Sequence, residues 1–262
     1  MLKAKSIQNI QKIIKGNITE DNGIILPEAL IILVEEYKIK YHLSCLVCQD
    51  GQYISKEKKY ENFFSYALYL INGSLINNKI HNGITMTFLV ENTGHWTCVQ
   101  LNIYLGKIYF FIIDAAGSDK VDRVIKNIRN IYELKSRKGL FGKIFCSKPK
   151  IQKDGLNCSL FSLHHAFKLS KLSDTFDFLR KKEYLFKKDM FYPDLISLVD
   201  VKYLHPSLLK GIQDYNILNY YDKSSMFNSN QSFNQLKEKL MPENINSKFS
   251  NPFFVEKREK NS

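Results

Sequence analysis

The sequence predicts an α+β fold in which a central mixed or antiparallel sheet is flanked by helices. Apolar residues recur at helical spacing before residue 72, strand-like apolar runs occupy residues 84–113, and helical spacing returns after residue 119. With 262 residues and a hydrophobic fraction of 44%, the chain is long and apolar enough to build the core of one large domain.

Helices are expected in both flanking parts of the chain. Leu26-Pro27-Glu28 opens the first, because proline suits the first helical position and glutamate complements the helix dipole, and its apolar residues continue to about Tyr37. Three further helices are expected, over Tyr60–Ile71, over Asp119–Leu134 and from Cys158 onward.

Strands are expected in the middle of the chain. Ile84–Val90 is a buried apolar run, and Trp96–Tyr104 and Lys107–Ile113 are joined by Leu105-Gly106, which suggests a hairpin. Phe141–Phe145 is a fourth candidate strand. The hairpin would bring the start of one strand and the end of the next to the same edge of the sheet.

The net charge points to an anionic partner. Thirty-eight Lys and Arg residues against 26 Asp and Glu residues give +12, which favours a nucleic acid, a phosphorylated ligand or a membrane surface. The alternative is that lysine is the default surface residue of a Lys-, Ile- and Asn-rich chain. No recognisable RNA- or DNA-binding motif occurs, so no specific nucleic-acid partner is expected.

The longest apolar run, Ala29–Val34, is far shorter than the ~18 residues of a membrane-spanning helix, so no transmembrane segment is expected.

The five cysteines do not form a disulfide pattern, because their number is odd and their spacing irregular. A reducing environment follows as the default. His42, Cys45 and Cys48 could suggest zinc, but no second ligand pair has finger-like spacing and the flanking residues are apolar. Buried structural thiols are the favoured interpretation, and no metal is expected.

Cys158 lies where a polar, glycine-containing approach meets the first turn of an amphipathic helix. Unpaired N–H groups at a helix start stabilise a thiolate, which is the reactive form of cysteine. His95 precedes one predicted strand and Asp114 ends the next. If Tyr104 faces Lys107 across the turn, His95 lies nine residues back and Asp114 seven residues on, and a small bulge would bring them into register.

These residues form a candidate catalytic set. Asp114 would orient His95, which would take the proton of Cys158. Gln152, six residues before the cysteine, offers an amide N–H to the oxyanion that forms when a thiolate attacks an acyl group, together with the backbone N–H of Cys158. Each residue alone has a structural explanation in packing, turn formation or burial. The prediction depends on their combination.

This His–acid–Gln–Cys order resembles the CE clan of cysteine proteases and, within it, the YopJ family of bacterial effector acetyltransferases. Residues 152–163 are similar to the family signature Gln-x5-Cys-Gly-x-Phe-Ser-Leu, and residues 204–218 resemble its C-terminal segment. Four features depart from the pattern. Ser159 replaces a glycine, and Gly155-Leu156-Asn157 replaces a more acidic and serine-rich approach. Asp114 stands where many members have glutamate, and Gly211 replaces a histidine.

The resemblance implies a CE clan (ubiquitin-like protease-like) catalytic core with His95, Asp114 and Cys158 as a triad and Gln152 at the oxyanion. It implies transfer of an acetyl group from acetyl-coenzyme A through an acyl-cysteine to a Ser, Thr or Lys residue of a host protein. A ubiquitin- or ubiquitin-like-specific cysteine protease is the alternative, because both reactions pass through an acyl-cysteine.

The resemblance also implies inositol hexakisphosphate as an activator. A basic cluster follows the helix that begins at Cys158 and could bind this polyphosphate, although a solvated helix face is an equal alternative. Its residues are Arg180, Lys181, Lys182, Lys187, Lys188 and, further on, Lys210, with Lys202 as an additional candidate.

The resemblance sets the expected organisation of the chain. We expect a polar leader and candidate secretion signal over residues 1–20 and a catalytic domain over residues 21–222, with a regulatory segment over about 175–222. Residues 223–262 are expected to form a flexible polar tail. The N-terminus lacks the apolar core of a cleaved signal peptide. The resemblance implies secretion from a bacterium into the host cytoplasm, here without a cleaved signal peptide.

Overall fold

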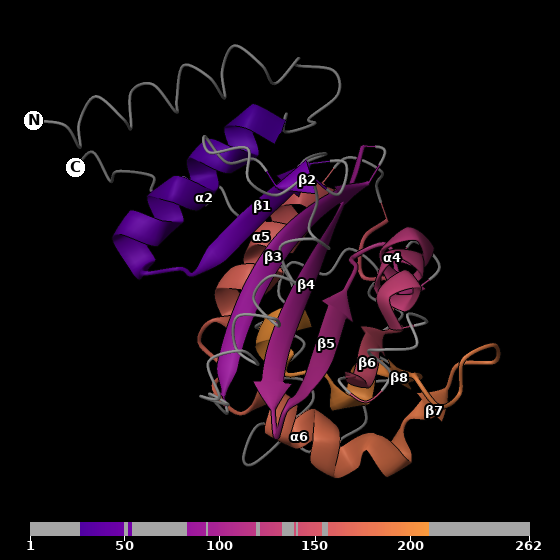
Figure 1. Cartoon of the computed structure of the whole chain (residues 1–262). Coiled ribbons are helices and arrows are strands. Elements are labelled where there is room, and N and C mark those ends of the chain that lie inside the picture. Colours follow the sequence, from indigo (N-terminus) through magenta and orange to yellow (C-terminus); the bar gives the residue numbers. More distant parts are fainter. Residues whose placement is uncertain are drawn as a thin grey trace, which may run out of the picture.

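The computed structural model describes residues 27–49, 52–53, 83–92, 94–118, 121–132, 139, 141–153 and 157–209. Within these ranges, eight strands form one sheet in the order β2-β1-β3-β4-β5-β6-β8-β7 (Figure 1). The predicted leader, the helix over Tyr60–Ile71, Lys210 and the tail over 223–262 lie outside the described residues.

Within the described residues, five strands follow the first helix, and helices and further strands come after them. The strands are β1 (Cys45–Gln49), β2 (Gln52–Tyr53), β3 (Ile84–Asn92), β4 (His95–Tyr104), β5 (Lys107–Ile113), β6 (Phe141–Ser147), β7 (Lys187–Lys188) and β8 (Ile196–Val199). The helices are α2 (Pro27–Tyr41), α4 (Asp122–Tyr132), α5 (Cys158–Leu169) and α6 (Thr175–Lys182), with short turns η3 (Glu183–Leu185), η4 (Val201–Tyr203) and η5 (Pro206–Leu209).

The sheet is mixed. Strands β3, β4 and β5 form an antiparallel meander, whereas β1 lies parallel to β3, β6 parallel to β5, and β8 parallel to β6. The predicted α+β fold, with a mixed sheet flanked by helices, is confirmed. Strands β1, β2, β7 and β8 were not predicted, because they are two to five residues long and too short to show a period.

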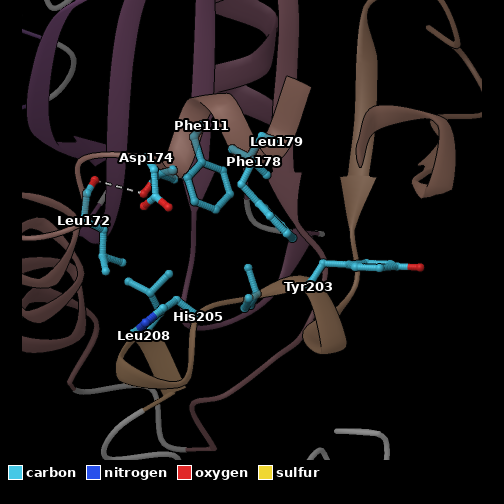
Figure 2. A pocket seen from close by; sticks show the side chains of 10 residues that line it. Phe111, Leu172, Asp174, Phe178, Leu179, Tyr203, His205 and Leu208 are labelled. Carbon is cyan, nitrogen blue, oxygen red and sulfur yellow. Dashed lines mark hydrogen bonds between the residues drawn. The ribbon is translucent and has the colours of Figure 1, made fainter. Parts of the chain in front are cut away.

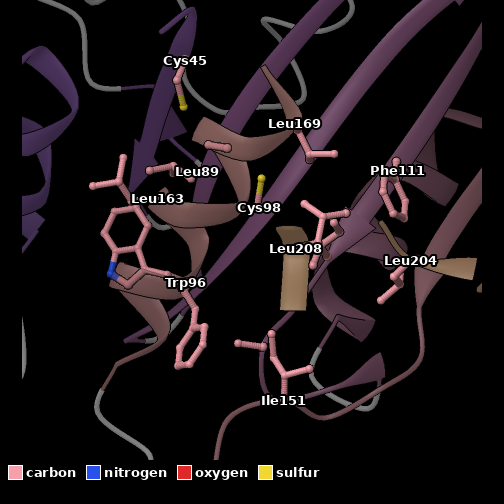
Figure 3. Packing of buried hydrophobic residues seen from close by; sticks show 14 of the residues in the cluster. Cys45, Leu89, Trp96, Cys98, Phe111, Ile151, Leu163, Leu169, Leu204 and Leu208 are labelled. Carbon is pink, nitrogen blue, oxygen red and sulfur yellow. The ribbon is translucent and has the colours of Figure 1, made fainter. Parts of the chain in front are cut away.

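Helices cover both faces of the sheet, with α5 and α4 on opposite sides (Figure 1). Successive strand residues point to opposite faces, so Phe111 packs in the α5 layer and Phe110 in the α4 layer. Figure 3 shows the α5 layer, in which Trp96 and Leu163 belong to one apolar cluster. This helix is buried on most sides, since η5 and α2 also pack against it.

The β4–β5 hairpin has the predicted pairing of Tyr104 with Lys107. Leu105 and Gly106 both have positive φ, 48° and 70°, as a two-residue hairpin turn requires. The pairs then run without interruption to Cys98 and Ile113, so the expected bulge is absent.

Predicted element boundaries hold to within a few residues. Helix α2 begins at Pro27 and continues to Tyr41, beyond the predicted end at Tyr37. Helix α4 begins at Asp122 rather than at residue 119, which places an acidic residue in its first turn. No helix among the described residues is long and apolar enough to cross a membrane.

Cys45 and Cys48 are buried thiols, as expected. Cys45 and Cys48 lie on β1 and pack in different layers of the core, so the two sulfur atoms cannot approach one metal ion together. Burial raises the pKa of Cys45 to about 12, which keeps it protonated. Across the described ranges, no group of three or more His, Cys, Asp or Glu residues could hold a metal ion.

Candidate active site

His95 and Asp114 meet at one edge of the sheet. His95 begins β4 and Asp114 follows β5, and the distance from His95 Nε2 to Asp114 Oδ2 is 2.7 Å. In the hairpin register the residue opposite Asp114 is Thr97, and its Oγ1 donates to the same Oδ2 at 2.7 Å. His95 and Thr97 lie two residues apart and therefore share a face of β4, so His95 reaches Asp114 diagonally without a bulge.

Thr97 is a member of the site that sequence reasoning missed. It is 1% exposed, and its hydroxyl is the second side-chain donor to the buried carboxylate. The signal was present in the sequence, because the Tyr104–Lys107 pairing alone places Thr97 opposite Asp114.

The loop after β5 fixes the carboxylate and connects it to the next loop. Asp114 Oδ1 accepts a hydrogen bond from the backbone N–H of Ala116 at 2.8 Å. The carbonyl of Ala115 accepts hydrogen bonds from the N–H groups of Ile151 and Gln152, both at 2.8 Å. Gln152 is 1% exposed, so it is held in the interior directly beside the Asp114 loop.

Cys158 is the first residue of α5 and is 5% exposed. The helix is anchored to the strand that bears the histidine, because Ser162 Oγ donates to the carbonyl of Trp96 at 2.9 Å. This contact, one turn after the cysteine and one residue after His95, sets the distance between helix start and strand start. Its role was not predicted.

Asp114 and Cys158 set the protonation of His95. The hydrogen bond with Asp114 has the largest effect on the pKa of His95, and the hydrogen bond with Cys158 has the next largest. Together they raise this pKa from 6.5 to about 10 against the opposing effect of burial. At neutral pH the ring is therefore an imidazolium. Since Nε2 faces Asp114, Nδ1 is the ring nitrogen that remains for Cys158.

The turn before His95 is stabilised by the conformation of Gly94 and by a hydrogen bond to Glu91. Gly94 has φ of 79°, a left-handed conformation that favours glycine, and its N–H donates to the carboxylate of Glu91. Glu91 is 5% exposed and lies across from Trp96 in the β3–β4 ladder. A buried acid thus holds the turn, and the orienting contact to His95 comes from Asp114.

The basic residues lie away from these groups. Arg180, on α6, donates to Asn102 Oδ1 at 2.9 Å, forms an ion pair with Asp177, and lies 4.0 Å from the ring centroid of Tyr104. Tyr104 ends β4, so Arg180 is at the opposite end of that strand from His95.

The remaining predicted cations differ in their surroundings. Lys181 and Lys187 are exposed and Lys182 is half-buried. Lys188 donates to Glu183 Oε1 at 2.8 Å. Lys202 lies over the ring of Tyr203.

His164 and His165 are packing residues, as expected. Both are buried, and their Nε2 atoms lie 2.9 Å and 3.1 Å from the carbonyls of Ser207 and Leu208. Burial, with the neighbouring His164, lowers the pKa of His165 to about 3. The two residues connect α5 to η5 and leave His95 as the histidine beside Cys158.

Two pockets lie away from the His95–Asp114 pair. The first, of about 20 Å³, is lined mainly by α6 and the C-terminal turns, and Figure 2 shows Phe111, Phe178 and Leu208 among its walls. It has room for about one water molecule. The second, of about 240 Å³, lies at the Tyr104 end of β4.

Comparison with known proteins identifies the family. The model of the family described as YopJ serine/threonine acetyltransferase matches residues 54–262, which is most of the chain. The chain belongs to the YopJ family. As a YopJ-family member it is an effector acetyltransferase, and effectors of this family are delivered into host cells to act on host proteins.

Solved structures show that the YopJ-family fold is shared. A deletion variant of AvrA, with IP6 and CoA, is 17% identical with a TM-score of 0.55, over 90% of this chain and 86% of that chain. HopZ1a in complex with IP6 is 12% identical with a TM-score of 0.51, over 87% and 85% of the two chains. Comparison of the sequence with curated proteins gives no match.

Proposed function

We propose that the acetyl transfer proceeds through an acetyl-cysteine on Cys158, with His95 as acid and base and Asp114 as the carboxylate that orients it. The observation that supports this most directly is the position of His95, which bonds to Asp114 at 2.7 Å and lies close enough to Cys158 for that thiol to raise the pKa of the ring. Gln152, held beside the Asp114 loop, would donate to the oxyanion together with the backbone N–H of Cys158.

In the first half-reaction, the Cys158 thiolate attacks the carbonyl carbon of acetyl-coenzyme A. A C–S bond to the cysteine forms, the C–S bond to coenzyme A breaks, and the departing thiolate takes the proton of the His95 imidazolium. The product is acetyl-Cys158 beside a neutral imidazole, which is the base that the next step needs.

In the second half-reaction, a hydroxyl or amino group of the target protein attacks the acetyl carbon and gives its proton to His95. The bond to Cys158 breaks, which restores the thiolate and the imidazolium. A Ser, Thr or Lys side chain can each serve as this acceptor. Cys158 is 5% exposed, which supports transfer over hydrolysis because a shielded acyl group meets little water.

Lysines that follow α5 would bind inositol hexakisphosphate as an activator. Lys181, Lys182 and Lys187 support this best, because Arg180 and Lys188 already bond to carboxylates. Lys210 is proposed from its position in the C-terminal motif and lies outside the described residues. The presence of IP6 in structures of AvrA and HopZ1a supports the activator, and CoA in both supports the acetyl donor.

We also propose that residues 1–20 serve in secretion without a cleaved signal peptide and that the protein acts in the host cytoplasm. A fusion of these residues to a reporter enzyme, expressed in the secreting bacterium, would test this. The reporter should reach host cells with residues 1–20 still attached, and retention of the fusion in the bacterium would contradict the proposal.

Incubation with radiolabelled acetyl-coenzyme A tests the chemistry. The parent protein should retain label, inositol hexakisphosphate should raise the amount, and Cys158→Ala should retain none. Cys45→Ala is the matched control, since this buried thiol stays protonated and its removal should leave labelling in place. Absence of label together with cleavage of a ubiquitin or ubiquitin-like fluorogenic substrate would support the protease alternative instead.

A further inference from the structure

A polar pocket lies at the end of the sheet opposite to His95, between β3, β4 and α6. Its volume is about 240 Å³, and its polar walls come from Thr85, Gln100, Asn102, Thr175, Asp177 and Arg180. The volume is below the range of about 300–1,000 Å³ typical of drug-sized ligands, which points to a smaller molecule.

The floor of this pocket is unusual for the inner face of a sheet. Gln100 and Asn102 alternate with Leu101 and so share the face of β4 that places Trp96 and Cys98 in the α5 layer. They are 3% and 5% exposed. Burial of an amide costs free energy unless every polar atom finds a partner, so a purely structural floor would be apolar.

Asn102 is satisfied by its neighbours, whereas Gln100 is not. Asn102 Nδ2 donates to Thr85 Oγ1 at 3.0 Å, and its Oδ1 accepts from Arg180 at 2.9 Å. Gln100 Nε2 donates to Thr87 Oγ1 at 3.4 Å. Gln100 Oε1 is buried and accepts no hydrogen bond from any described residue. The pocket therefore presents an acceptor that needs a donor.

The charges around the pocket favour a neutral ligand. Arg180 is paired with Asp177, and its guanidinium lies over the ring of Tyr104. An anion would have to displace the Asp177 carboxylate, and a cation would meet the Arg180 guanidinium. Hydroxyl groups can donate to Gln100 and Asp177 and also accept from Arg180.

We propose that this pocket binds a neutral polyhydroxylated molecule of monosaccharide size, with one hydroxyl donating to Gln100 Oε1. Tyr104 and Phe176 supply apolar walls for the C–H faces of such a ring. The site is separate from the proposed acetyl-transfer centre, since Gln100 and His95 are on opposite faces and different parts of β4.

Saturation-transfer NMR on the full chain, with D-glucose, D-galactose, D-mannose and D-ribose as probes, tests the proposal. At least one sugar should receive saturation from the parent protein, and Gln100→Leu should weaken its binding about tenfold, since a buried hydrogen bond is lost. Thr85→Val, an isosteric change at the rim, provides a second variant if Gln100→Leu does not fold. Lys107→Ala, which lies opposite Tyr104 in the ladder but does not line the pocket, is the control and should bind as the parent does.

The absence of saturation transfer to all four sugars would overturn the proposal. Equal binding by the parent, Gln100→Leu and Thr85→Val would also overturn it, because the sugar would then bind elsewhere. Neither result bears on the acetyl-cysteine, which is read from the labelling of Cys158 in the absence of sugar.

Discussion

Replacement of Thr97 by valine removes one hydrogen bond and changes little else. Valine has the shape of threonine, and the site is 1% exposed, so the change takes a 2.7 Å donor from the buried Asp114 carboxylate. A hydrogen bond to a charged group contributes about 1.5–3 kcal/mol to the free energy of unfolding. For a domain of this size, a loss of about 2 kcal/mol lowers Tm by about 4–8 °C.

The acetylation rate should fall as well, because Asp114 Oδ2 also bonds to His95. With one donor missing, the carboxylate can move, and a displacement of a fraction of an ångström at the histidine costs roughly tenfold in rate. The assay is single-turnover labelling with acetyl-coenzyme A across a pH series, beside thermal unfolding followed by circular dichroism.

The conservative variant Thr97→Ser separates the hydrogen bond from packing. Serine keeps the hydroxyl, so it should recover most of the rate even though it loses a methyl group. If Thr97→Val matched the parent in both Tm and rate, the reasoning would be wrong. Damage from serine with none from valine would show that Thr97 matters through its methyl group and not through its hydroxyl.

Three further predictions concern titration and packing. Because the folded protein binds the His95 proton more tightly than the unfolded chain, the stabilisation is full below about pH 6.5 and is lost as the pH rises through about 10. The free energies of unfolding of the parent and of His95→Gln, measured with urea, should therefore converge as the pH rises across that interval. A difference that stays constant with pH would contradict a raised pKa of His95. His165 has its pKa lowered to about 3, so its contribution is present above about pH 6.5 and is lost as the pH falls from there toward 3. His165→Gln should make the free energy of unfolding less sensitive to acid, and unchanged acid sensitivity would count against a buried neutral ring. At Gly142 an added Cβ would lie 2.3 Å from the ring of Tyr109, so Gly142→Ala should cost about 1–3 kcal/mol in chemical unfolding, whereas Gly139→Ala, with open space around it, should cost much less.

The sequence predicted the elements that have strong local signals. The hairpin turn at Leu105-Gly106 and the long apolar runs of β3, β4 and β5 gave both the strands and their register. The short strands β1 and β8 were missed, because pairing with β3 and β6, which are distant in the chain, makes these segments strands. Their own residues carry no period that a short window could detect.

In the candidate site, too, the residue types could be predicted from the sequence but the geometry of the contacts between them could not. His95, Asp114, Gln152 and Cys158 could be named from residue types and spacing, since their chemistry requires a base, a carboxylate, an amide and a thiol. The expected bulge was wrong, because a diagonal contact across the ladder already joins His95 to Asp114.

The sequence by itself determined the order of these functional groups, the hairpin register and the family resemblance, because residue types and local turn geometry are read directly from the chain. Only the tertiary structure decided which groups touch. Trp96 and Ser162, far apart in the chain, bond between β4 and α5, and this contact positions the histidine and the cysteine. The same reason explains the surroundings of Arg180, which packs between Asn102, Asp177 and Tyr104. A side chain's partners depend on which segments the fold brings together, and no spacing along the chain contains that information.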